Sequence, residues 1–286
     1  MDGIVVGVDR SAAAAGALEW ALEEGVRRGS KVTALCAWTD LATAGYPLGG
    51  VLVTDPAQVE RLARETAEEL LKEATGTVAG ADGIETGVAA LRGAAAAVLA
   101  EMSRTADLVV VGTRSASALS RAVLGSVSSS LLHHAASPVV VVPEPRAAGT
   151  RPPRVVVGVD HSPESKVALQ WAADAAARRG WPLVPVFVRE ATFDEVTADL
   201  SLAELEDHER AALRSAVGTF EGVVEPEVLT GHAGEQLLEM VEPQDLLVVG
   251  SRGRGGFTGL LLGSTSTSVA QHAVCPVAVL PRGVQA

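Results

Sequence analysis

The sequence carries the same pattern twice, and this repeat constrains the fold more than any other feature. Residues 4–11 (IVVGVDRS) recur at 155–162 as VVVGVDHS, an offset of 151 residues. Further along, ADLVVVGTRS at 106–115 recurs at 244–253 as QDLLVVGSRG, with an offset of 138. Chance does not sustain collinear blocks of this length. We therefore predict that the chain consists of two copies of one domain.

The two copies differ in length, and a linker joins them. The drop in offset from 151 to 138 means that the first copy has about 13 extra residues, which we expect mainly in the Gly- and Pro-containing stretch 41–56. The joining segment, EPRAAGTRPPR, is rich in Pro and Arg, as linkers often are. We predict a first domain over residues 1–146 and a second over 153–286.

Each copy alternates apolar strand patterns with helix patterns. In the first copy we expect a helix between Ser11, as N-cap, and Gly29, as the residue that ends it. Ser162 and Pro163 start the corresponding helix of the second copy. The expected strands of the first copy cover residues 4–9, 32–38, 87–91, 108–112 and 139–142, and the further helices cover 57–75, 94–104 and a segment from 126. Strict alternation predicts an α/β fold, a parallel sheet with helices on both faces in each copy.

Composition excludes several classes of protein. The chain is 48% hydrophobic, but its apolar runs have the length of strands and fall short of the ~20 residues that a membrane-spanning helix needs. It starts directly on a strand pattern without a basic leader, so we expect a cytoplasmic protein. The net charge of −12 argues against a nucleic-acid partner. Cys36 and Cys275 lie in apolar contexts in different copies, and we expect buried thiols rather than a disulfide.

Candidate ligand-binding residues follow the first and the fourth strand. Open parallel sheets bind ligands beyond the carboxyl ends of their strands, where the strand order reverses. Asp9 and Asp160 end the two first strands, and the loop after the fourth strand of the second copy reads Gly250-x2-Gly253-x9-Gly263-Ser264. Such glycines let backbone N–H groups approach a phosphate, and the helix that follows presents its positive end. A flexible loop before a capped helix is the alternative, but the position directly after a strand favours phosphate binding.

These motifs resemble the universal stress protein family in its tandem form. The resemblance rests on VGVD-x-S, on G-x2-G-x9-G-[ST] and on the closing strand after His-Ala-x-x-Pro, and it covers both copies nearly end to end. It implies two tandem open five-stranded Rossmann-like sheets of order 3-2-1-4-5 and, through the glycine loop, ATP as the ligand. Asp160 would then lie near the ribose and the Val188 backbone near the adenine. The phosphates would be held by Gly250, Gly253, Gly263, Ser264 and Thr265, with Arg252 within reach of their oxygens or merely solvated.

The first copy departs from the glycine pattern. Ser115 stands where the second copy has Gly253, and a Cβ there obstructs a phosphate or disfavours positive φ, although a small Ser could be tolerated. Whether the first copy binds ATP is therefore open, and we expect the second copy to bind it more tightly. The corresponding residues of the first copy are Asp9, Ala37, Gly112, Arg114, Ser115, Gly125, Ser126 and Val127.

We expect an ATP-binding regulatory protein of the stress response, with ATP bound alone or with Mg²⁺. The chain has no G-x4-GK[ST], and none of Lys31, Lys72 and Lys166 lies in a glycine loop. No carboxylate or histidine lies in the stretch 250–265 to position an attacking water, so hydrolysis is expected to be slow at most. Two alternatives stay open: a slow ATPase or phosphotransferase, and a nucleotide-free module that binds a protein partner.

Neither catalytic nor metal-binding residues are expected. His133 and His134 are adjacent and point in different directions on a helix, and His134 and His272 are expected near helix C-termini. The apolar last strands, 139–142 and 277–280, would be aggregation-prone if exposed, so we expect them to join the two halves as a pseudo-two-fold pair. A further homodimer is implied by the resemblance, and the protein partner is unknown.

Overall fold

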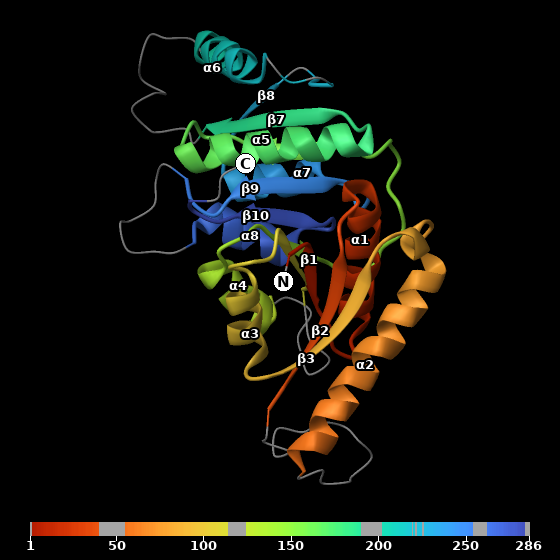
Figure 1. Cartoon of the computed structure of the whole chain (residues 1–286). Coiled ribbons are helices and arrows are strands. Elements are labelled where there is room, and N and C mark those ends of the chain that lie inside the picture. The colour runs from red at the N-terminus through yellow and green to blue at the C-terminus, as the bar shows by residue number, and fades with distance from the viewer. Residues whose placement is uncertain are drawn as a thin grey trace. The chain divides into compact units, whose positions relative to one another are not determined.

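The computed structural model divides the chain into two compact units, Met1–Glu144 and Pro145–Ala286 (Figure 1). Each unit is described by itself. The residues that the structure describes are 2–39, 55–113, 124–189, 202–218, 220, 222–224, 226–253 and 262–283. No helix among these residues combines the length and the apolar character needed to span a membrane.

The first unit contains a five-stranded parallel sheet in the order β3-β2-β1-β4-β5. Its strands are β1 (Ile4–Gly7), β2 (Val32–Trp38), β3 (Thr86–Arg92), β4 (Leu108–Gly112) and β5 (Val139–Val142). Its helices are α1 (Ala12–Arg28), α2 (Pro56–Thr77), the 3-10 helix η1 (Ala81–Gly83), α3 (Ala95–Met102) and α4 (Ser126–His134). Helices α1 and α2 cover one face of the sheet, and α3 and α4 cover the other (Figure 1). The chain reverses direction across the sheet between β1 and β4, so a switch point lies there.

The second unit repeats this architecture with the order β8-β7-β6-β9-β10, again all parallel. Its strands are β6 (Val155–Gly158), β7 (Leu183–Arg189), β8 (Glu227–Thr230), β9 (Leu246–Gly250) and β10 (Val277–Leu280). Its helices are α5 (Pro163–Arg179), α6 (Leu202–Val217), α7 (Ala233–Met240) and α8 (Ser264–His272). Within each unit the order is 3-2-1-4-5, so the predicted fold class is confirmed.

The predicted helix caps are also confirmed. The Ser11 Oγ accepts a hydrogen bond from the Ala14 N–H at 3.1 Å, and α1 ends at Gly29, whose φ of 62° is left-handed. In α5 the Ser162 Oγ accepts the Ser165 N–H at 3.1 Å. These bonds satisfy N–H groups that a helix start leaves unpaired, so both first helices begin at a fixed residue directly after the first strand.

The second helices of the two copies differ in their described length. Helix α2 spans 22 residues and the described part of α6 spans 16, and residues 190–201 before α6 lie outside the described residues. The location of the extra residues in the stretch 41–56 therefore stays a prediction. Most of that stretch, residues 41–54, lies outside the described residues.

The core of each unit consists of buried aliphatic strands, as the composition predicts. Cys36 and Cys275 are both buried and do not form a disulfide, as expected. Burial raises the pKa of the Cys275 thiol to about 12. Such a group stays protonated at neutral pH and behaves as a small apolar side chain.

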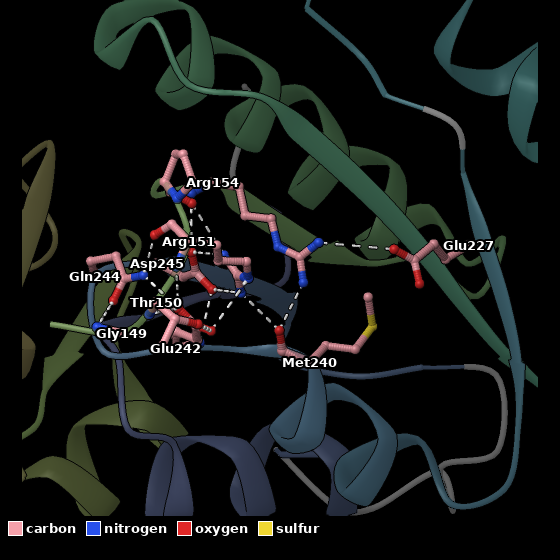
Figure 2. Close-up of polar contacts among 10 residues, drawn as sticks. Gly149, Thr150, Arg151, Arg154, Glu227, Met240, Glu242, Gln244 and Asp245 are labelled. Carbon is pink, nitrogen blue, oxygen red and sulfur yellow. Dashed lines mark hydrogen bonds and ion pairs between the residues drawn. The ribbon is translucent and has the colours of Figure 1, made fainter.

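The linker is bound to the second unit by a polar network at the amino ends of β6 and β9 (Figure 2). The Arg151 guanidinium donates to both carboxylate oxygens of Asp245, through Nη1 to Oδ1 at 2.8 Å and through Nη2 to Oδ2. The same carboxylate accepts the backbone N–H groups of Arg154 at 3.0 Å and Glu242 at 2.8 Å. Asp245 is only 2% exposed, so the Arg151 guanidinium is the main group that offsets the lost hydration of this carboxylate.

A second layer of contacts holds the preceding linker residues (Figure 2). The Thr150 N–H donates to the Glu242 carboxylate at 2.9 Å, and the Gly149 N–H donates to the Gln244 Oε1 at 2.6 Å. The Gln244 side chain donates to Glu242 at 2.7 Å, and this hydrogen bond is the largest cause of the lowered pKa of Glu242. The ordered second unit therefore extends back at least to Gly149.

Candidate functional site

Asp160 directly follows β6 and lies at the carboxyl edge of the second sheet. Its Oδ1 accepts hydrogen bonds from the Ser162 N–H at 3.1 Å and from the Ser162 Oγ at 2.6 Å. In the first unit Asp9 Oδ1 accepts the same two groups of Ser11 at 3.0 and 2.5 Å. The serine that caps the first helix thus also orients the aspartate, and the motif D-x-S is one local structure in both units.

The glycine loop approaches this aspartate in the second unit. A Cβ placed on Gly253 would lie only 2.3 Å from the Asp160 Oδ2. Any side chain at residue 253 would force the loop or the carboxylate to move, so the approach as it stands depends on the glycine. The predicted juxtaposition of the aspartate with the glycine loop is present in the structure, at the switch point between β6 and β9.

The glycines at the ends of β4 and β9 are explained by the packing of a helix against the strand. A Cβ on Gly250 would meet Glu164, in the first turn of α5, at 3.2 Å. A Cβ on Gly112 would meet the backbone of Ala13, in the first turn of α1, at 2.7 Å. Close packing of the first helix on the fourth strand therefore explains both glycines without a ligand. Among the described residues, the nearest atom to a Cβ on Gly263 would be 3.5 Å away, an ordinary contact, so packing against them does not explain that glycine.

The described ends of the glycine loop are fixed by hydrogen bonds. The Gly263 N–H donates to the Ser251 carbonyl at 2.8 Å, and the Ser251 N–H donates to the Leu280 carbonyl at 2.7 Å. The Ser266 Oγ donates to the Gly250 carbonyl at 2.7 Å. Helix α8 therefore starts beside the end of β9, with Ser264 and Thr265 in its first turn. Helix α4 starts in the same way with Ser126 and Val127 after Gly125.

Two helix N-termini at this edge have no side-chain cap from the described residues. The N-cap residue of α8 is Gly263 and that of α7 is His232, and neither gives a side-chain hydrogen bond to its helix. The two helices lie close together, because a Cβ on Gly234 would meet Ser268 at 3.0 Å. Helix α5, on the other face, is capped by Ser162. The positive ends of α7 and α8 thus favour an anion at the carboxyl edge, and sequence reasoning missed the contribution of α7.

The backbone N–H and C=O of Val188 lie beside the switch point, on the side of β7 that faces β6. The Val159 N–H donates to the Val186 carbonyl at 2.8 Å, so the polar groups of Val186 face β6. Backbone groups alternate along a strand, so the N–H and C=O of Val188 face the same side, beyond Gly158, where β6 ends. In the first unit Val8 donates to Leu35 at 2.9 Å, which places the groups of Ala37 in the same way.

The remaining predicted residues are two arginines and a serine of the glycine loops and two histidines at helix ends. Arg252 is half-buried in the loop, whereas Arg114 and Ser115 lie outside the described residues. His134 and His272 each lie in the last turn of a helix, with Nδ1 at 2.7 and 3.0 Å from the carbonyl four residues earlier, as predicted. In the described part of the chain, no three His, Cys, Asp or Glu side chains come together as a metal site.

A contact that sequence reasoning missed involves His161, between Asp160 and Ser162. Its φ is 61°, the one positive value of a non-glycine residue among those described. Its Nε2 lies 2.8 Å from the Glu209 Oε2 of α6, and its ring lies against Phe187. The corresponding Arg10 donates to the Thr66 Oγ1 of α2 at 3.1 Å. In both units the residue after the aspartate thus contacts the second helix.

This geometry defines a protein with two tandem Rossmann-like units and an anion-favouring edge at the switch point, and comparison with known proteins gives its family. The profile of the Universal stress protein family matches residues 1–143 and 153–281. A universal stress protein of Mycolicibacterium smegmatis is 36% identical over 286 residues, which cover 97% of this chain and 96% of that protein. A universal stress protein of Mycobacterium tuberculosis is 34% identical over 302 residues, covering 97% and 94%.

A solved structure agrees with these sequence relatives. The crystal structure of a universal stress protein from Archaeoglobus fulgidus matches with a TM-score of 0.66 and 25% identity, and the match covers 98% of both chains. The chain belongs to the universal stress protein family, in the form that carries two family segments in tandem. The predicted resemblance is confirmed.

Proposed function

We propose that this protein is an ATP-binding regulatory protein of the stress response, and that the second unit holds the nucleotide between the ends of β6 and β9. The observation that carries the proposal is the approach of Gly253 to Asp160, within 2.3 Å for a Cβ on the glycine. The loop backbone can come this close to the oriented carboxylate because residue 253 has no side chain, so the aspartate and the beginning of the glycine loop border one site at the switch point.

The residues at this edge fit the parts of an adenine nucleotide. The N–H and C=O of Val188, beyond the end of β6, match the donor and acceptor on the adenine edge. Asp160 suits a ribose hydroxyl, because its carboxylate is already oriented by Ser162. The N–H groups and hydroxyls of Ser264 and Thr265, at the uncapped start of α8, suit the phosphates. Mg²⁺ would bind to the phosphate chain as its counterion.

We propose binding rather than rapid catalysis as the function of this site. The stretch 250–265 contains no carboxylate and no histidine, and Asp160 already accepts two hydrogen bonds from Ser162. A water positioned for attack on the terminal phosphate would therefore have no base in the loop. The bound nucleotide would act by changing the stability or the surface of the protein, as a ligand that binds only the folded state does.

The direct experiment is to denature the full-length protein, purified without added nucleotide, and to identify what it releases by chromatography. We expect an adenine nucleotide, and a rise in the unfolding temperature when ATP is added to nucleotide-depleted protein. Gly253→Ala should release much less nucleotide from the same preparation. Wild-type protein that releases no nucleotide and shows no thermal shift with ATP would overturn the proposal.

A further inference from the structure

His161 is the middle residue of the turn that carries the Asp160 carboxylate. On one side of this carboxylate, Oδ1 accepts the N–H and the hydroxyl of Ser162 at 3.1 and 2.6 Å. On the other side, Oδ2 lies 2.3 Å from the Cβ position of Gly253. Any movement of the backbone at His161 therefore displaces the carboxylate relative to the glycine loop.

The backbone of His161 has a left-handed conformation, with a φ of 61°. This conformation is unfavourable for a residue with a Cβ. The D-x-S turn itself does not require it, because in the first unit Asp9 accepts the same two groups of Ser11 although Arg10 between them has no positive φ. The conformation is therefore attributable to the contacts of the His161 side chain.

These contacts fasten the turn to two elements of the second unit. The imidazole Nε2 lies 2.8 Å from the Glu209 Oε2 on α6 and donates to it, because a carboxylate only accepts. The ring centroid lies 5.1 Å from that of Phe187 on β7. Leu213, one turn after Glu209, is fully buried, so this part of α6 is anchored in the core. His161 thus connects the turn to a fixed part of the fold.

The corresponding contact of the first unit is much more exposed. Arg10 donates to the Thr66 Oγ1 at 3.1 Å and lies 3.5 Å from the Glu69 carboxylate, and the side chains of Arg10 and Glu69 are 60% and 70% exposed. The side chains of His161 and Glu209 are only 20% and 26% exposed. An ion pair in water restrains its partners little. The unit with the intact glycine loop therefore has the more enclosed contact behind its aspartate.

We propose that His161 is a positioning residue of the second unit: held by Glu209 and Phe187, it fixes the turn that directs the Asp160 carboxylate toward a ribose hydroxyl. This inference rests on the proposed nucleotide site. A carboxylate that is already fixed loses less conformational freedom on binding than a mobile one. Loss of the contact between His161 and Glu209 therefore weakens recognition of the ribose and leaves the contacts with adenine and phosphates in place.

The experiment compares the affinity of the full-length protein for ATP and for dideoxy-ATP, which lacks both ribose hydroxyls. The wild type should prefer ATP about ten- to hundredfold, because a hydrogen bond to a charged group is otherwise lost. Glu209→Ala should lower this preference about three- to tenfold, the cost of immobilising one side chain, and change dideoxy-ATP binding less than about twofold. The matched control is Asp207→Ala, which removes another carboxylate of α6, paired with Arg210 and 78% exposed, and should leave the preference unchanged.

Variants of His161 itself give an independent test. His161→Ala should lower the preference for ATP as Glu209→Ala does, and the double variant should add little, because both changes break the same contact. His161→Gln keeps an N–H donor separated from Cβ by the same number of bonds as the imidazole Nε2. It should therefore retain more of the preference than His161→Ala.

The outcomes are distinguishable from failure of the proposed function itself. Wild-type protein that binds no adenine nucleotide overturns both proposals. Wild-type protein that binds ATP and dideoxy-ATP equally overturns only the role of His161, since no ribose contact is then left to position. A Glu209→Ala variant that weakens both nucleotides equally, or neither, has the same consequence. Unfolding temperatures without ligand show whether each variant is folded, and the comparison of His161→Gln with His161→Ala decides if Glu209→Ala is not.

Discussion

At the scale of single residues, the contact between Asp160 and Gly253 is the feature on which the functional proposal depends. The two residues are far apart in the sequence, and D-x-S and the glycine loop are separately recognisable. Their approach follows only once the strand order places β6 beside β9, and that order came from the family resemblance. The close approach of Gly250 to α5 was not predictable, because no sequence pattern distinguishes a glycine required for packing from one required by a ligand.

Gly253→Ala should weaken ATP binding by at least about tenfold, on the order of 1.4 kcal/mol, because the new methyl group must push the loop or the Asp160 carboxylate out of place. Equilibrium dialysis with labelled ATP measures the effect. Gly76→Ala is the matched control, because a Cβ there meets no atom of the described residues within 4 Å. An affinity unchanged by Gly253→Ala would show that the loop tolerates a side chain at this residue.

Cys275 predicts a pH dependence of stability. Burial raises its pKa from 9.0 to about 12, so the folded state holds the proton more tightly than the unfolded state. The contribution of this protonated thiol to the free energy of unfolding is complete below pH 9 and is lost as the pH rises through about 12. The free energy of unfolding of the wild type should therefore fall between these values. Cys275→Ala should remove this part of the slope, which denaturant unfolding at several pH values measures. A Cys36→Ala variant that lost the same part of the slope would contradict the assignment.

At the scale of elements, the sequence predicted the strands closely and the helix ends well where a cap marks them. β2, β4 and β5 have the bounds expected from their apolar runs, and α1 and α5 begin after their serine caps. Helix α2 was predicted at 57–75 and spans Pro56–Thr77, so its bounds differ from the expected ones by one residue at the start and two at the end. The uncapped start of α7 was also missed, since a missing cap leaves no positive mark in a sequence.

The corresponding glycines Gly112 and Gly250 predict that an alanine substitution destabilises the first unit more than the second. A Cβ on Gly112 would lie 2.7 Å from the backbone of Ala13, and one on Gly250 would lie 3.2 Å from Glu164. Gly112→Ala should destabilise its unit by about 1–3 kcal/mol, the usual range for overpacking, and Gly250→Ala by less. Chemical denaturation of the two full-length variants without nucleotide measures both. A larger cost for Gly250→Ala would mean that the first helix of the second unit fits its strand more tightly than the distances indicate.

The linker contact of Arg151 with Asp245 predicts that the second unit needs residues before β6 for its stability. Arg151→Ala leaves the buried Asp245 carboxylate without its cation and should cost about 3–5 kcal/mol of unfolding free energy. Sequence reasoning missed this contact because a segment rich in Pro and Arg is typical of a solvated spacer.

The control for Arg151→Ala is Arg146→Ala, at an exposed linker residue, which should change the stability by less than about 0.5 kcal/mol. Thermal unfolding of both full-length variants decides the question. Equal midpoints for the two variants would show that Arg151 contributes no more than an ordinary surface cation.

At the scale of the whole molecule, the repeat predicts two folds of one kind and unequal sites. Both units have the strand order 3-2-1-4-5 and the same D-x-S geometry. They differ at Ser115 against Gly253 and at Arg10 against His161. The pairing of the two halves through 139–142 and 277–280, and a further homodimer, stay predictions that analytical ultracentrifugation can test.

The most direct test of unequal sites is calorimetric titration of full-length protein with ATP, comparing the wild type with Gly253→Ser and Ser115→Gly. A lost hydrogen bond to a charged phosphate costs roughly 1.5–3 kcal/mol, or about one to two decades in affinity. The wild type should therefore show a tighter and a weaker binding event. Gly253→Ser should abolish the tighter event, and Ser115→Gly should strengthen the weaker one. A tighter event that survives Gly253→Ser would contradict the assignment of the main ATP site to the second unit.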